Sequence, residues 1–95
     1  MNTRAKAAAL AAVAELAENA WLHFAPIRER GQAGQIGADA MHEKMSDATA
    51  KLFWKLDQIH FRLVAPHVWV GADHGEIVEA FANARAAITE ASLEA

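Results

Sequence analysis

Apolar side chains recur every three or four residues between Asp39 and Ala65, and this repeat constrains the fold more than any other feature. Such a spacing places side chains on one face of an α-helix. The repeat consists of Met41, Met45, Ala48, Leu52, Leu56, Ile59 and Leu63. Asp39 can cap the start of the helix, and Pro66 prevents its continuation. The sequence therefore predicts a central helix over residues 39–65, about 40 Å long at ~1.5 Å per residue.

Two further segments show helical periodicity, one on each side of the central helix. The first covers about residues 3–24 and should end or kink at Pro26, which lacks a backbone donor. The last covers residues 74–93, and Asp73 and Glu76 at its start have the spacing of a capping box. The expected apolar faces are Leu10, Val13, Leu16, Ala17, Ala20 and Phe24 in the first helix, and Ile77, Phe81, Ala84, Ile88 and Ala91 in the last.

The predicted fold is all-α, with a single helical domain over residues 1–95. It is a three-helix bundle or an extended helical hairpin with a long central helix. A glycine-rich hinge over residues 31–37 separates the first two helices. The chain contains 24 alanines among its 95 residues, and alanine buries little apolar surface. Because such a core is thin, we expect a homodimer in which a second copy supplies further burial.

Composition and charge exclude several classes of function. The chain has no cysteine, which excludes disulfides, a thiol nucleophile and cysteine-ligated zinc. Its formal net charge of −3 has the wrong sign for a generic nucleic-acid binder. No segment approaches the ~20 apolar residues of a membrane span, so we expect a cytoplasmic protein that does not bind membranes. We also expect neither catalysis nor a cofactor, because no residue pattern typical of either is present.

Aromatic side chains form a second apolar face on the predicted central helix. Trp54 and Phe61 point nearly opposite to the main apolar row. Residues 3–24 or the segment around Trp69 could cover this face, and otherwise another molecule must cover it. Large aromatic residues dominate the energetics of protein interfaces. The candidate partner-binding residues are therefore Trp21, Trp54, Phe61 and Trp69, with Glu76 and Glu79 of the acidic last helix steering the approach.

Two other kinds of site remain open. One flank of the central helix carries a basic row, spaced by seven, four and seven residues, that could contact phosphates: Lys44, Lys51, Lys55 and Arg62. Separately, Asp57 and His60 are three residues apart and could share a metal ion. His67, Asp73 and His74 could supply further ligands, although the Glu-x-x-His pattern of di-iron bundles is absent.

These features favour a small, non-enzymatic protein–protein interaction module. An inhibitor of phage or mobile-element type, which binds and blocks a larger protein complex, would suit the chain's size and its acidic last helix. One alternative is a nucleic-acid-associated helical dimer that uses the basic row. The other alternative is a metal-binding helical bundle that uses the His and Asp side chains.

Overall fold

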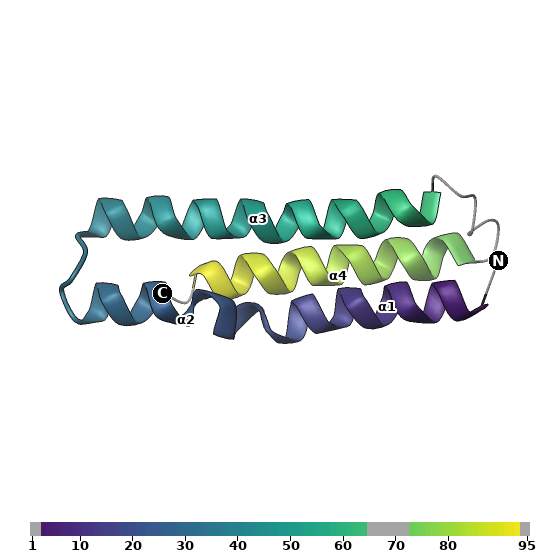
Figure 1. Cartoon of the computed structure of the whole chain (residues 1–95), viewed down its shortest axis with the longest axis horizontal. Coiled ribbons are helices and arrows are strands. Elements are labelled where there is room, and N and C mark those ends of the chain that lie inside the picture. Colours follow the sequence, from purple (N-terminus) through teal and green to yellow (C-terminus); the bar gives the residue numbers. More distant parts are fainter. Residues whose placement is uncertain (1–2, 65–72, 94–95) are drawn as a thin grey trace.

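The computed structural model describes residues 3–64 and 73–93, and the regular structure within these ranges is entirely helical. The helices are α1 (Thr3–Glu18), α2 (Ala20–Gln32), α3 (Ala38–Val64) and α4 (Asp73–Leu93). Helices α1 and α2 follow one another end to end, α3 returns antiparallel to them, and α4 packs against both arms (Figure 1). The bundle measures 50 × 19 × 17 Å. The predicted all-α class and long helix are thus confirmed.

The core contains the apolar faces that the sequence predicts. Helix α3 buries Met45, Ala48, Leu52, Leu56 and Leu63, and α4 buries Ile77, Phe81, Ala84, Ile88 and Ala91. Val13 from α1, together with Ala20 and Phe24 from α2, completes this cluster. Each fully buried Leu, Ile or Phe side chain contributes roughly 1.5–3 kcal/mol relative to exposure. Four of the six remaining positions are alanines, whose short side chains let the helices approach closely but add little burial.

The first helical arm is interrupted at Asn19 rather than at Pro26, so the predicted end of this helix is wrong. The Asn19 amide donates to the Glu15 carbonyl at 3.0 Å, and the His23 amide donates to the Asn19 carbonyl at 2.9 Å. The interruption is therefore a local turn within a nearly continuous helical path. Pro26 lies inside α2, which packs against both α3 and α4. This packing offsets the backbone hydrogen bond that proline removes.

The connection between α2 and α3 begins later than expected, because α2 includes Gly31 and ends at Gln32. Gly34 has a φ of 72°, in the left-handed region that glycine adopts without steric cost. Its amide donates to the Gly31 carbonyl at 3.1 Å, and the Gln35 amide donates to the Arg30 carbonyl at 2.9 Å. These two bonds form a Schellman motif. Gly34, not Gly31, therefore terminates the helix.

Two ion pairs connect helices that are distant in sequence. Lys6 Nζ on α1 lies 2.5 Å from Glu76 Oε2 on α4. Arg85 on α4 donates to Asp57 on α3 at 2.5 Å, and its guanidinium also lies over the Phe53 ring. Both pairs hold α4 in place between its neighbours. Over residues 3–64 and 73–93, none of the helices combines the length and hydrophobicity that a membrane crossing requires.

Candidate functional site

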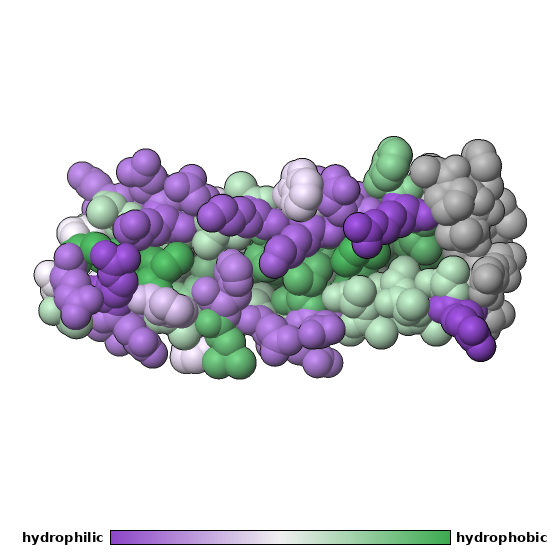
Figure 2. Space-filling view, in the orientation of Figure 1, coloured by the Kyte–Doolittle hydropathy of each residue, from purple (hydrophilic) through white to green (hydrophobic). Residues whose placement is uncertain are grey.

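A groove of about 580 Å³ runs between the α1–α2 junction and α3. One wall comes from Ala12, Glu15, Leu16, Asn19 and His23, and the other comes from Leu52, Trp54, Lys55, Gln58, Ile59 and Arg62. Figure 2 shows the same face of the molecule, where a hydrophobic strip runs between hydrophilic borders. We call this feature the α1–α3 groove. It is open to solvent along its length rather than enclosed like a small-molecule site.

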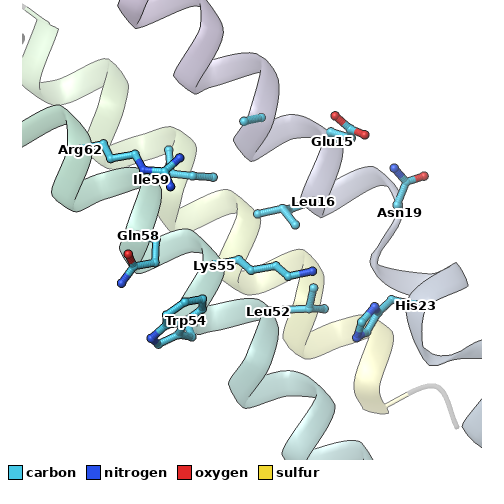
Figure 3. Close-up of a pocket in the computed structure, with 11 residues that line it drawn as sticks. Glu15, Leu16, Asn19, His23, Leu52, Trp54, Lys55, Gln58, Ile59 and Arg62 are labelled. Atoms are coloured by element: carbon cyan, nitrogen blue, oxygen red, sulfur yellow. The ribbon is translucent and has the colours of Figure 1, made fainter.

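The floor of the α1–α3 groove is apolar and its α3 wall is basic. Leu52 is buried, whereas Leu16 and Ile59 are half-buried and remain partly accessible from the groove. Lys55 extends from α3 across the groove towards the α1–α2 arm, while Trp54 points away from that arm (Figure 3). An apolar floor bordered by charge is the usual anatomy of a surface that receives an amphipathic segment.

The basic row predicted on α3 is exposed, and two of its four residues line this groove. Lys55 and Arg62 line it, and Lys44 and Lys51 continue the same flank of α3. Within residues 3–64 and 73–93, none of these four cations forms an ion pair with a carboxylate. Their positive charge is available to an anionic partner.

His23 reports the electrostatic character of the groove. Burial of the imidazole, followed by the positive charges of Lys55 and Lys51, lowers the pKa of His23 below its ordinary value of 6.5. Its ring also meets the neighbouring Phe24 ring edge-on, with 5.5 Å between the centroids. The lysines of α3 thus act on a side chain of α2 across the groove. Sequence reasoning missed His23, because the arm that faces the basic row cannot be identified from periodicity alone.

Trp54 and Phe61 are the most exposed aromatic side chains among the described residues, at 63% and 66%. Of the covers considered from the sequence, residues 3–24 do not bury either ring. The other predicted cover, the segment around Trp69, lies outside the described residues. The role of Trp69 in partner binding therefore stays a prediction. Trp54 stands at the rim of the α1–α3 groove. We call Trp54 and Phe61, with the groove beside them, the α3 surface.

The remaining predicted partner-binding residues lie away from the α3 surface. Trp21 on α2 is 49% exposed, but Arg28 stacks on its ring and donates to its carbonyl oxygen at 2.6 Å. Glu76 is paired with Lys6, and Glu79 is exposed on the outer side of α4. Among the described residues, the structure therefore does not gather Trp21, Trp54, Phe61, Glu76 and Glu79 into one patch. Their role in binding remains a prediction.

The proposed metal ligands on α3 have other partners in the structure. Asp57 accepts the hydrogen bond from Arg85, and the His60 ring stacks on Phe81 with 4.8 Å between centroids. Across the described ranges, no three His, Cys, Asp or Glu side chains are grouped closely enough to hold a metal ion. The side chains of His67, Asp73 and His74 lie outside the described part, so they add nothing to this alternative.

Comparisons with protein-family models, with curated proteins and with solved structures found no significant match to this chain.

Proposed function

We propose that this chain is a small, non-enzymatic protein–protein interaction module that binds its partner through the α3 surface. One observation carries the proposal: Trp54 and Phe61, two turns apart on one helix, are left 63% and 66% exposed beside an open groove with an apolar floor. Scattered exposed apolar residues are ordinary on protein surfaces. Two large aromatics form a larger and more specific feature when they lie next to a groove with an apolar floor and a row of cations without ion pairs in the described part of the chain.

The finer proposal is that binding blocks the partner. A chain of 95 residues that covers a functional surface of a larger complex can inhibit it without any chemistry of its own. An inhibitor of phage or mobile-element type, acting in the cytoplasm, is the class that the sequence features favour. The support for this step is the size of the chain and the exposed aromatic surface.

Substitution of the two aromatics tests the proposal. Trp54→Ala and Phe61→Ala should leave helicity and thermal stability unchanged, because both side chains are mostly exposed. Each should abolish co-purification of the partner from the native host. Leu22→Ala is the matched control, since Leu22 is also 63% exposed but lies on α2. Retained co-purification in the Trp54 and Phe61 variants, or loss in the Leu22 variant, would contradict the proposal.

The homodimer expected from the sequence would use the same aromatic face. Sedimentation equilibrium distinguishes this use from binding to a different protein. A measured mass of twice the chain mass of 10.3 kDa, which falls to 10.3 kDa in the Phe61→Ala variant, would show that the aromatic face contacts a second copy. A constant mass of 10.3 kDa leaves the face to a different protein.

A second candidate function is nucleic-acid binding by the row of Lys44, Lys51, Lys55 and Arg62. The observation that favours it is the absence of ion pairs to these four residues within the described ranges. If the row contacts phosphates, the chain must bind duplex DNA, and the logarithm of the binding constant must fall linearly with the logarithm of the salt concentration. Changing Lys51 and Lys55 to Glu should then remove both affinity and salt dependence. An affinity for DNA that does not change with salt concentration would reject nucleic-acid binding by this row.

A further inference from the structure

We propose that the α1–α3 groove binds an acidic amphipathic helix of a partner protein, as a fourth helix added to the bundle. The inference rests on the proposed interaction function and names the chemistry of the partner. It is carried by the shape of the groove, its apolar floor and the charge of its α3 wall.

The shape of the groove suits a helix. Its walls are two antiparallel helices, and α4 packs against the same pair on the other side (Figure 3). The lining on α3 extends from Leu52 to Arg62. That stretch corresponds to ~15 Å of helix axis, or about three turns of a bound helix. On the opposite wall, Ala12 allows a close approach because its side chain is short.

The floor of the groove determines which side chains the bound helix presents. Leu16 and Ile59 are only half-buried, and the buried Leu52 lines the same groove. A helix with apolar residues at i, i+3 or i+4, and i+7 would cover these side chains with one continuous stripe. Trp54 stands at the rim, where an aromatic ring contributes most when a partner covers it.

The charge of the groove determines the flank of the bound helix. Lys55 and Arg62 line the α3 wall without ion pairs in the described part of the chain, and Lys51 lies one turn before them. Glu15 is the acidic residue that lines the opposite wall. The lowered pKa of His23 is caused in part by Lys55 and Lys51, so their charge is felt across the groove. Glu or Asp residues flanking the apolar stripe would therefore complement the α3 wall.

A second copy of this chain fits the groove less well. The outer face of α4 carries Glu79 and Glu90, but the exposed positions between them are short or polar, such as Ala82 and Ala86. The large exposed apolar residues of α4, Val78 and Leu93, are about four turns apart near its two ends, so they form no continuous stripe to cover the floor. A second α3 would offer Trp54 and Phe61, but it would also bring its own four cations into the same interface. Like charges at such short range disfavour that arrangement.

The test uses the purified full chain and a display library of helical peptides of about 20 residues, or roughly six turns. Each peptide has an invariant leucine stripe, and each flanking position is either Glu or Lys. Selection should enrich Glu on one flank of the bound peptides. No enrichment of Glu, or enrichment of Lys, would overturn the inference.

A matched pair of charge variants locates the binding. The Lys55→Glu, Arg62→Glu double variant should weaken the selected peptides by about tenfold. The Arg30→Glu, Lys44→Glu double variant makes the same change in net charge outside the lining of the groove, and it should weaken them much less. Equal weakening in both variants would show a general charge effect and overturn the inference.

Two further outcomes would assign the groove to another occupant and overturn the inference. One is a homodimer in sedimentation that only the Lys55→Glu, Arg62→Glu variant dissociates. The other is duplex DNA binding that this variant abolishes while the selected peptides fail to bind. The peptide library does not contain the natural partner, so the two proposals can fail separately. Failure of the peptide selection would overturn only the inference about the groove. Co-purification retained by the Trp54→Ala variant would instead contradict the proposed function.

Discussion

The guanidinium of Arg28 stacks on the ring of Trp21, with 3.7 Å between its central carbon and the ring centroid. It also donates to the Trp21 carbonyl oxygen at 2.6 Å, seven residues back along α2. Arg28 is only 4% exposed, and its Nη1 atom has no hydrogen-bond partner among the described residues. The stack thus replaces part of the solvation that burial removes from the cation. It also holds Trp21 against α2.

Arg28→Ala should lower the free energy of unfolding by about 1–3 kcal/mol, because the buried stem and the stack on Trp21 are both lost. Arg28→Met should cost less, since it retains the stem and removes the unsatisfied Nη1. Urea denaturation of the three proteins measures the difference. Equal destabilisation by both substitutions would show that the guanidinium, rather than the stem, stabilises the fold.

Leu56→Ala should lower the free energy of unfolding by about 2–5 kcal/mol, because Leu56 is fully buried at the centre of α3 and its removal leaves a cavity. Thermal or chemical denaturation followed by circular dichroism measures this loss. The control is Leu22→Ala on the exposed side of α2, which should change stability by less than ~0.5 kcal/mol. Similar losses of stability for the two variants would mean that Leu56 does not belong to the buried core.

Asp57→Asn should cost less than about 1 kcal/mol, because Asp57 and Arg85 are both substantially exposed and water screens their attraction. The small loss should shrink further in high salt. A double-mutant cycle with Arg85→Ala isolates the pair from the contact between Arg85 and Phe53. A coupling energy that does not change with salt concentration would contradict this description of the ion pair.

The stability of the chain should fall as the pH drops below about 6.5, in part through His23. Burial and the charges of Lys55 and Lys51 lower the pKa of His23 in the folded state, so the unfolded state binds the proton more readily. His23 therefore contributes its full stabilisation at pH values above its ordinary pKa of 6.5. This contribution is lost as the pH falls from 6.5 towards the lowered pKa of the folded state. Denaturation midpoints across this range measure the slope, which His23→Gln should reduce. An unchanged slope in that variant would exclude His23 as its source.

Periodicity predicted the core of the structure well, because burial on a helix follows directly from the spacing of apolar residues. Leu52 and Leu56 of α3, like Ile77 and Ile88 of α4, are buried as their spacing indicates. The interruption at Asn19 could not be predicted, because neither proline nor glycine marks it in the sequence. Propensity pointed to Pro26 instead, but tertiary packing retained that residue inside α2.

The candidate site was predicted only in part. The sequence placed Trp54, Phe61 and the basic row on one helix, but it left open whether the two rings are covered. The α1–α3 groove was not, because it requires knowing which flank of α3 faces the first arm. The burial of Arg28 was also missed, since a single arginine in a polar stretch carries no signal of its stacking partner.

Binding through the α3 surface requires that position 54 contact another protein in living cells. A photoreactive amino acid placed at position 54 tests this, with position 22 as a matched control of equal exposure on α2. Illumination of the native host should attach one protein species to the chain labelled at position 54 and not to the chain labelled at position 22. No adduct at position 54, or the same adducts from both positions, would contradict the claim that the α3 surface binds a partner.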